Sequence, residues 1–558
     1  EFVQSTAGQA AMRNIDREQK TFLSKLRSQK IEYELVYSYK TVTNSVAIEV
    51  DTSYVKRIKD FGGVASASIA RTYLAPQVEE GSSDGSAVVN DAYVYETGIY
   101  NSTAVADAEW GGKGEGMTVA VLDTGLDYSH EAFQKAPPAE TLKMDKTYVA
   151  ERLANTVAAS KMAEKGTSFT LDDAFVSDKV PFAFDYADID ADVYPSYSNH
   201  GTHVAGIVAG QADSYVDKDG NVPMEDGKPI PFKGVAPEAQ LLIFKTFTDN
   251  LDDPALGGAE AESIMAALED CVIMGVDVIN MSLGSTAGFT TTDDGDDEGE
   301  IFNGIFKSIQ DAGINLICAA SNDYSAGFGS VYGTNLASNP DSGTVGSPST
   351  YFTALSVASI SGQKSQYLLS EDGDAIFFDN ASNGAGTDYD FVKEFFEKNF
   401  PGENIGEEGK AVTFVYVGTG EAYEYTDSVK AIINNSEKQP VIVLATRGGK
   451  TFQEKVTIAA NNKAAGFILF NNVSGTIKMS IGDIEKDKRI PAISITKDAG
   501  EKLRTLAASG KNTVIVSTRS AGPFMSEFSS WGTTNDLRIK PEITAHGGEI
   551  TSSVRGGY

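Results

Sequence analysis

The sequence is poor in cysteine and in positive charge, and it contains no long apolar run. Cys271 falls in a helix-like stretch and Cys318 in an apolar, strand-like stretch, so we expect two buried free thiols and no zinc site. No run of about 18 apolar residues occurs, so we expect no segment to span a membrane. The first residues, 1–14, also lack the basic start and apolar core of a signal peptide, so we expect any such peptide to have been removed or to lie outside this sequence.

The charge of the chain is strongly one-sided. There are 46 basic and 78 acidic residues, which gives a net charge of −32. This excess argues against nucleic acid or an anionic membrane surface as a partner. We interpret the acidic surface as a means of staying soluble. Asp293–Glu300 and Asp217–Asn221 are acidic loops that could hold structural calcium, but neither matches a full calcium-loop motif.

Residues 1–80 have the pattern of a small α+β domain, followed by a polar linker over residues 81–100. Helical spacing and period-two alternation predict its elements. The predicted helices are Asp16–Lys30 and Ser53–Phe61, and the predicted strands are Ile31–Tyr39, Ser45–Val50 and Val64–Tyr73. Glu79–Asp91 is small and polar, so we expect an exposed segment that proteases can reach.

Residues 101–360 alternate between predicted strands and helices, which indicates an α/β fold with a parallel sheet covered on both faces. The predicted strands are Thr118–Asp123, Gln240–Phe247, Val276–Leu283, Asn315–Ala320 and Leu355–Ile360, and the predicted helices are His200–Gly210, Glu260–Met274 and Ile301–Ala312.

Residues 361–520 interrupt this rhythm and have strands and helices of their own, so we expect a self-contained inserted domain. Its predicted strands include Ala411–Tyr416, Gln439–Leu444 and Ala465–Phe470, with a helix at Phe452–Asn461. The pattern of the first domain resumes over residues 521–558.

Three polar residues stand where catalytic groups of a parallel α/β protein are found. Asp123 ends an apolar strand, His200 begins a helix and Asn322 follows another apolar strand. A carboxylate can orient an imidazole base, and a strand-end amide can donate to an oxyanion. The helix dipole should disfavour the protonated imidazole and keep His200 available as a base. Taken singly, Asp123 and Asn322 could equally be turn or cap residues.

The remaining histidines have simpler interpretations. His203 follows His200 by three residues, but without an HExxH pattern we expect a packed core residue and no zinc site. His130 is predicted to be a surface or capping residue and His546 a loop residue.

Several motifs together resemble the subtilisin-like serine proteases. DTGLD from Asp123, NHGTHVAG from Asn199, VINMSLG from Val278, AASND from Ala319 and the stretch Phe528–Ser553 occur in the order typical of that family. The first of these motifs and the insertion are most similar to the cell-envelope proteinases and complement-cleaving peptidases of Gram-positive bacteria. The inserted region looks like a protease-associated domain, and residues 1–80 resemble the subtilisin propeptide, a folding chaperone and inhibitor.

The resemblance implies a role for each matching residue. It implies that Asp123 orients the base, His200 is the general base and acid, and Asn322 contributes to the oxyanion hole. Ser282, Leu283 and Gly284 resemble the strand that pairs with substrate backbone and walls the first specificity pocket. No cofactor is expected for the chemistry. The implied partners are protein or peptide substrates and the chain's own propeptide.

Three departures from the family pattern affect these expectations. The GTSMA(S/A)P motif is absent, so the nucleophilic serine is expected on residues after Tyr558 or on a separate C-terminal fragment, and this chain alone should be inactive. Ser321 stands where the family usually has glycine, which could narrow the specificity pocket. Ala545-His546-Gly547 replaces the usual Ala-Pro-Gly.

Two functions follow from this pattern. The first is a secreted or cell-surface serine endopeptidase in zymogen form. The alternative is a pseudoprotease that keeps the fold but acts as a binding or regulatory module; the missing serine motif favours it, and the intact Asp123, His200 and Asn322 weigh against it.

Overall fold

The computed structural model describes residues 3–73, 112–215, 231–249, 258–285, 297–323, 343–361, 365–384, 388–434, 440–473, 479–485, 488–522 and most of 524–557, with a few residues between 222 and 229 and at 477. The expected linker over residues 81–100 and the two acidic loops considered for calcium lie outside these residues or outside the described side chains. The chain divides into two compact units, one of which is the segment Gln363–Phe524. We call this segment the inserted unit and the other the main unit.

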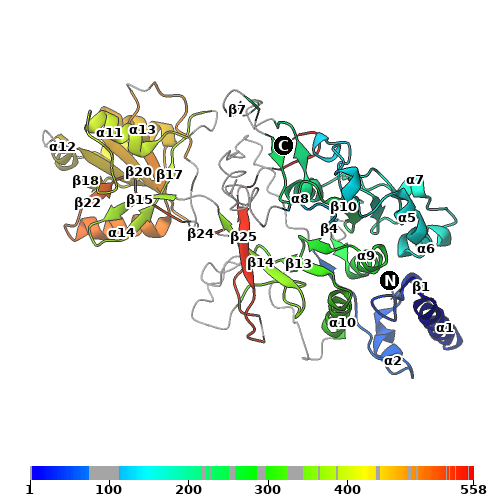
Figure 1. Cartoon of the computed structure of the whole chain (residues 1–558). Helices are drawn as coiled ribbons and strands as arrows, with labels where there is room; N and C mark the ends of the chain where they lie inside the picture. Colours follow the sequence, from blue (N-terminus) through cyan, green and yellow to red (C-terminus); the bar gives the residue numbers. More distant parts are fainter. Residues whose placement is uncertain are drawn as a thin grey trace. The chain divides into compact units, whose positions relative to one another are not determined.

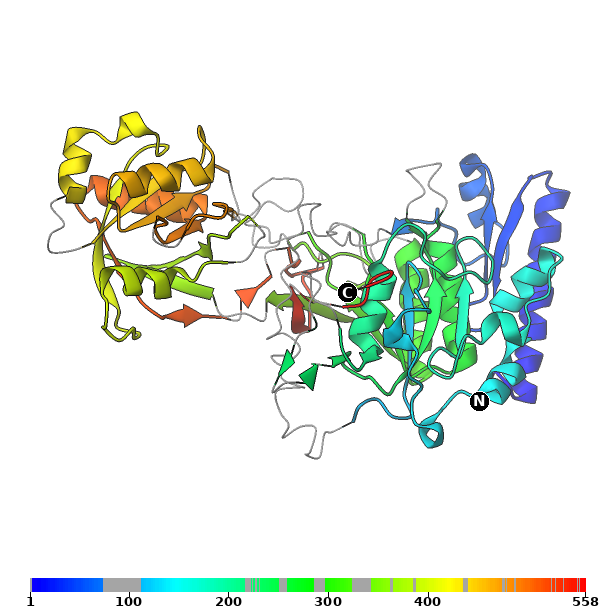
Figure 2. The same cartoon turned by 90° about the horizontal axis from the view of Figure 1, so that it is seen from above.

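A parallel sheet forms the centre of the main unit (Figures 1 and 2). Its strands lie in the order β14-β13-β12-β4-β10-β5, and β25 pairs with β14. All of these pairings are parallel. The strands are β4 (Thr118–Asp123), β5 (Phe182–Asp185), β10 (Gln240–Lys245), β12 (Val278–Met281), β13 (Asn315–Ala319), β14 (Leu355–Ser361) and β25 (Ile543–Gly548).

Helices cover both faces of this sheet. Residues of α8 (His200–Ala209) pack with Val119 and Val121 of β4 on one face. Residues of α9 (Ala261–Met274) and α10 (Asp297–Asp311) pack with Ala120 and Leu122 on the other. Because successive side chains of a strand point to opposite faces, the fully buried β4 contributes to both cores. Three shorter helices, α5 (Lys146–Leu153), α6 (Val157–Glu164) and α7 (Leu171–Ala174), lie between β4 and β5 in the chain.

The N-terminal region belongs to the main unit and packs against α9 (Figure 1). It consists of α1 (Thr6–Ser28), the antiparallel pair β1 (Glu34–Tyr39) and β2 (Ser45–Glu49), α2 (Val55–Lys59) and β3 (Thr72–Tyr73). Helix α1 begins ten residues earlier than predicted because the Ser5 hydroxyl accepts a hydrogen bond from the Gly8 amide and caps the helix. The prediction of a strand over Val64–Tyr73 was wrong except for its last two residues, which pair with β11 (Ala259–Glu260).

The inserted unit is a second α/β layer structure. Its mixed sheet has the strand order β16-β15-β22-β18-β19-β20-β21-β17. Helices α11 (Phe391–Asn399) and α14 (Lys497–Ala508) contribute to one apolar core, and α12 (Asp427–Asn434) and α13 (Phe452–Asn461) to the other. The strands are β15 (Ser365–Ser370), β16 (Ala375–Phe377), β17 (Asp379–Asn380), β18 (Lys410–Tyr416), β19 (Val441–Thr446), β20 (Gly466–Phe470), β21 (Ala492–Ile495) and β22 (Thr513–Val516).

Several sequence predictions about single residues can be compared with the structure. Cys271 and Cys318 are buried free thiols, as predicted, and burial raises the pKa of Cys318 to about 12. His546 is wrongly predicted to be a loop residue: it lies in β25, opposite Ile360 of β14. No helix among the described residues is long and apolar enough to cross a membrane.

Candidate active site

The carboxyl end of β4 directs Asp123 towards α8. Asp123 is two residues after Val121 and four after Val119, both of which pack on the α8 face, so its side chain points to the same face. The side chain is only 2% exposed. Its Oδ1 atom accepts a hydrogen bond from the Thr124 amide at 2.7 Å. The adjacent backbone therefore fixes the orientation of the carboxylate.

His200 is the first residue of α8, and its imidazole forms a hydrogen bond with the Asp123 carboxylate. The Nδ1 atom lies 2.7 Å from Asp123 Oδ1, and only 7% of the residue is exposed. Because a carboxylate can only accept, Nδ1 carries the proton and Nε2 is left as the basic nitrogen. Nε2 makes no hydrogen bond to the described residues, and the second oxygen of Asp123, Oδ2, is buried without a partner among them.

The protonation equilibrium of His200 is set by two opposing effects. Burial lowers the pKa of His200, but the Asp123 carboxylate and its hydrogen bond raise it by more, and the net pKa lies above its ordinary value. The prediction that the helix dipole keeps His200 neutral therefore misses the larger influence of the carboxylate. The result is a more basic imidazole held in one tautomer.

Close packing brings the start of α8 against the turn after β4. A Cβ atom on Gly201 would lie 2.2 Å from the Gly125 carbonyl oxygen, so only glycine allows this approach. The Thr124 hydroxyl accepts a hydrogen bond from the Gly201 amide at 2.8 Å and donates one to the Ser198 carbonyl. The residues next to Asp123 and His200 in the chain, Thr124 and Gly201, are thus also in direct contact.

His203 lies one turn further along α8 and has no catalytic geometry. Its Nε2 donates to the Ile550 carbonyl at 3.0 Å. Burial lowers the pKa of His203 to about 4, with a smaller effect from nearby His200. A neutral, packed histidine is what the sequence predicts at this position. No cluster of three histidine, cysteine, aspartate or glutamate residues suited to a metal ion occurs in the described part of the chain.

Asn322 lies on the same edge of the sheet as Asp123. It follows β13, which is two strands from β4 in the sheet, a separation of about 10 Å at ordinary strand spacing. Asn322 is exposed, and its turn is held by the Ser530 amide, which donates to the Ser321 carbonyl at 2.9 Å, and by the Asp323 amide, which donates to Ser530 Oγ. The amide side chain is therefore available at this edge.

Ser321 occupies a backbone conformation that suits glycine better. Its φ of +88° lies in the left-handed region, where a side chain costs about 1 kcal/mol. The Ser321 side chain fills the space between Gly284 and Gly346. A Cβ atom added to Gly284 would lie 2.9 Å from Ser321 Oγ, and one added to Gly346 would lie 2.2 Å from it. The serine hydroxyl thus reduces the room beside the Ser282–Gly284 segment.

The segment Ser282–Gly284 follows β12, between β4 and β13, at the same carboxyl edge. Leu283 is buried in the main core, while Ser282 and Gly284 are partly exposed. Ser282 Oγ accepts a hydrogen bond from the Asn280 side chain at 3.0 Å. The sheet topology therefore brings all six predicted site residues to one edge.

Sequence reasoning missed the contacts of the segment 550–557. Besides Ile550, Ser552 and Ser553 donate to the His203 and Thr202 carbonyls at 2.8 and 3.0 Å. Gly206 permits this packing, since a Cβ atom there would lie 2.3 Å from both serine hydroxyls. Figure 1 shows the C-terminal end of the chain beside α8. No local pattern in the sequence signals a contact between residues so far apart in the chain.

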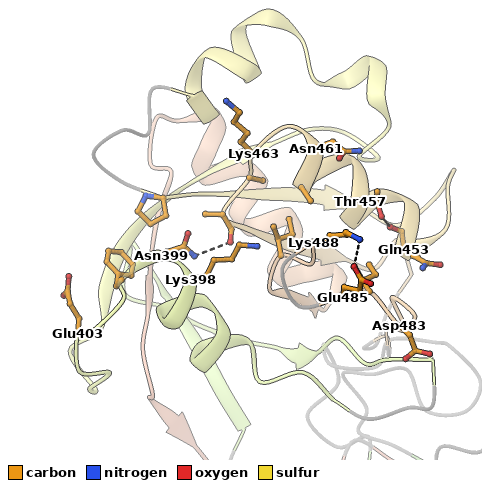
Figure 3. Close-up of a pocket in the computed structure, with 17 residues that line it drawn as sticks. Lys398, Asn399, Glu403, Gln453, Thr457, Asn461, Lys463, Asp483, Glu485 and Lys488 are labelled. Atoms are coloured by element: carbon orange, nitrogen blue, oxygen red, sulfur yellow. Dashed lines mark hydrogen bonds and ion pairs between the residues drawn. The ribbon is translucent and has the colours of Figure 1, made fainter.

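A hollow of about 1300 Å³ lies in the inserted unit and is lined mainly by polar residues (Figure 3). Two of its three lysines are already engaged: Lys488 pairs with Glu485, and Lys398 donates to the Arg489 carbonyl at 2.7 Å. The hollow contains no histidine, cysteine or serine among its lining residues. It offers no base and nucleophile comparable to the Asp123–His200 site.

A parallel α/β sheet with a buried aspartate–histidine pair at its carboxyl edge defines a subtilisin-like fold and site. The chain belongs to the subtilase family (Peptidase_S8), whose model matches residues 114–557.

The chain is similar to several known proteins. A PII-type proteinase of Lacticaseibacillus paracasei is 27% identical over 539 residues, covering 92% of this chain and 24% of its own length. A C5a peptidase of Streptococcus pyogenes is 30% identical over 459 residues, covering 80% and 33%. The epidermin leader peptide processing serine protease of Staphylococcus aureus aligns in structure with a TM-score of 0.35 and 14% identity, covering 62% of this chain and 67% of its own. The chain spans about a quarter to a third of the length of these curated relatives.

Proposed function

We propose that the chain is part of a secreted or cell-surface serine endopeptidase that hydrolyses peptide bonds of protein substrates by Asp-His-Ser catalysis. The observation that carries this proposal is the buried hydrogen bond of 2.7 Å between Asp123 Oδ1 and His200 Nδ1. The subtilase family and the relatives named above support the same reaction.

In this proposal His200 Nε2 takes the proton of a serine hydroxyl as it attacks the scissile carbonyl, and later returns it to the leaving amine. Asp123 holds the Nδ1–H tautomer and stabilises the imidazolium that forms. The exposed amide of Asn322 donates to the oxyanion. The nucleophile is proposed to lie outside this chain, on residues after Tyr558 or on a C-terminal fragment.

Substrate would bind along the edge that carries Ser282, Leu283 and Gly284. Backbone pairing there supplies affinity, and the space reduced by Ser321 limits the side chain that enters beside Gly284 and Gly346. We therefore propose a preference for small side chains in this pocket.

Residues 1–80 are proposed to act as an inhibitory propeptide. Tyr37 Oη donates to the Tyr186 carbonyl at 2.6 Å, and Tyr39 Oη donates to the Glu262 carbonyl at 2.9 Å. Glu269 of α9 accepts hydrogen bonds from the amides of Thr41 and Val42 at 2.7 and 3.0 Å. These buried and partly buried contacts support a specific docked state. The inserted unit is proposed to be a protease-associated domain, and the whole protein a cell-envelope enzyme.

The test uses the full-length protein, a fluorophosphonate probe and casein as substrate. We expect labelling and hydrolysis, both lost in His200→Ala and both retained in His546→Ala, which changes a histidine of β25 instead. Absence of labelling from a protein that is folded by circular dichroism would contradict the proposal and favour the pseudoprotease.

A further inference from the structure

The turn Val554–Gly557 is held more firmly than its short length would suggest. Each of its four amides donates a hydrogen bond. The Val554 and Gly557 amides donate to each other's carbonyl groups, at 2.8 and 3.0 Å. The Arg555 amide donates to Asn199 Oδ1 at 3.1 Å and the Gly556 amide to Asp127 Oδ2 at 3.3 Å. Two of the four acceptors are therefore side chains from the region around Asp123 and His200.

His130 contributes a further contact to this turn. The residue is 7% exposed, and its Nδ1 accepts a hydrogen bond from the Ala132 amide at 3.1 Å. Its Nε2 lies 2.7 Å from the Gly557 carbonyl oxygen. Because Nδ1 accepts from an amide and Nε2 faces a carbonyl, the neutral tautomer with the proton on Nε2 satisfies both contacts. His130 thus both caps a short helical turn and binds the chain at Gly557.

Asp127 connects the same turn to α8. The residue is 3% exposed, and its carboxylate accepts hydrogen bonds from Ser129 as well as from Gly556. Its amide donates to the Thr202 hydroxyl of α8 at 2.9 Å. Asp127 and His130 both lie in the segment that follows β4, four and seven residues after Asp123.

Arg555 connects the turn to the segment that precedes His200. Its guanidinium donates to the carbonyl oxygens of Pro195 and Ser196 at 3.0 and 2.8 Å. With the Arg555 amide on Asn199 Oδ1, Arg555 contacts three residues of the segment 195–199. Asn199 makes no side-chain cap to α8, so its side chain serves the turn instead.

We propose that Asp127, His130 and Arg555 are positioning residues that hold the turn 554–557 against the start of α8 and set the direction in which the chain leaves Gly557. Their catalytic importance rests on the proposed function, because only then does the chain beyond the turn carry the nucleophile towards His200 Nε2. We call the contacts of Asp127, His130 and Arg555 with this turn and its surroundings the clamp. The clamp lies within this chain and does not depend on the proposed function. A displacement of about 1 Å in a catalytic group can cost about 10²-fold in rate, so a loosened clamp should lower kcat.

Two substitutions of His130 separate its two contacts. His130→Asn keeps an acceptor near the Nδ1 position and a good helix cap, but loses the donor to Gly557. His130→Gln keeps a donor near the Nε2 position. If His130 only caps the local turn, the asparagine variant should keep the original exchange rate and kcat. If His130 positions the turn 554–557, the glutamine variant should keep them instead. Arg555→Ala is a second test at an exposed position that poses little risk to folding.

The first measurement is hydrogen exchange of the peptide covering 550–557 in the 558-residue chain. We expect exchange at least about tenfold faster in His130→Asn and Arg555→Ala, and near the original rate in His130→Gln. Unchanged protection in both His130→Asn and Arg555→Ala would overturn the clamp.

The second measurement is kinetics of the full-length protein. We expect kcat to fall about 10- to 100-fold in His130→Asn with KM within about threefold, and most of kcat to return in His130→Gln. Faster exchange with unchanged kcat would overturn the positioning role. An unreactive full-length protein that still shows the exchange differences would contradict the proposed function and leave the clamp supported.

Discussion

The substitution Asp123→Asn should lower the pKa of His200 from above to below the ordinary value of about 6.5. In the folded protein, burial lowers the pKa of His200 and the carboxylate outweighs it. The amide has the same shape but no charge, so only the effect of burial remains. At a charge separation of about 4 Å and an effective dielectric constant of about 20, the lost attraction is about 4 kcal/mol, or at most about 3 pKa units. We therefore expect a fall of about 1 to 3 units.

This shift can be measured on the 558-residue chain, without a nucleophile. The sequence has four histidines, so labelling with [13Cε1]histidine gives a spectrum of four signals. The signal of His200 is the one that disappears in His200→Gln. The neighbouring signal of His203 is expected to titrate far lower, since burial lowers the pKa of His203 to about 4. A matched control is Asp192→Asn, an exposed carboxylate in the loop that leads to His200, which should shift the His200 pKa by less than about 0.3 units because solvent screens it.

The same pair predicts a pH dependence of stability. Because the folded pKa of His200 is raised, the stabilisation is present below the unfolded value of about 6.5 and is lost as the pH rises through the folded pKa. The difference in thermal unfolding temperature between the original chain and Asp123→Asn should therefore be larger at pH 6 than at pH 9. An unchanged or higher His200 pKa in the variant would refute the electrostatic reasoning.

Three further predictions follow from the structure. In the full-length protein, Asn322→Ala should lower kcat by about 10²- to 10³-fold, the magnitude measured for an oxyanion-hole amide in a subtilisin, with little change in KM; an unchanged kcat would remove Asn322 from the site. Gly206→Ala should destabilise the chain by about 1 to 3 kcal/mol in urea unfolding, because the added Cβ would lie 2.3 Å from two serine hydroxyls. The control Gly304→Ala in α10 has open space around the added Cβ and should stabilise the chain by about 0.5 to 1 kcal/mol. Equal effects of the two substitutions would contradict the packing argument. Cys271 and Cys318 should react with a thiol reagent only after denaturation, because burial raises the pKa of each thiol; rapid reaction of the folded chain would contradict their burial.

Local signals explain why much of the main sheet and Asp123 and His200 could be predicted. The apolar run before Asp123 predicts β4, which the structure has at Thr118–Asp123. The residue His200 begins α8, and the helix at Phe452–Asn461 has the predicted bounds. In each case a few adjacent residues show both the hydrophobic periodicity and a turn or cap signal.

Features that depend on distant partners could not be predicted in this way. The alternating residues of Val64–Tyr73 suggest a strand, but only Thr72–Tyr73 finds a partner, in β11. β25 contains His546 in a stretch with no strand periodicity, and it forms by pairing with β14. The contact of His130 with Gly557 joins residues 427 positions apart, for which a single sequence holds no local signal.

In the proposed function, Asp123 and His200 activate a serine that follows Tyr558 in the full-length protein. The most direct test is to label that protein with a fluorophosphonate, digest it and identify the modified residue by mass spectrometry. We expect one labelled serine beyond Tyr558, with labelling abolished in His200→Ala. A label on a serine within residues 1–558, or labelling that survives the loss of His200, would contradict it.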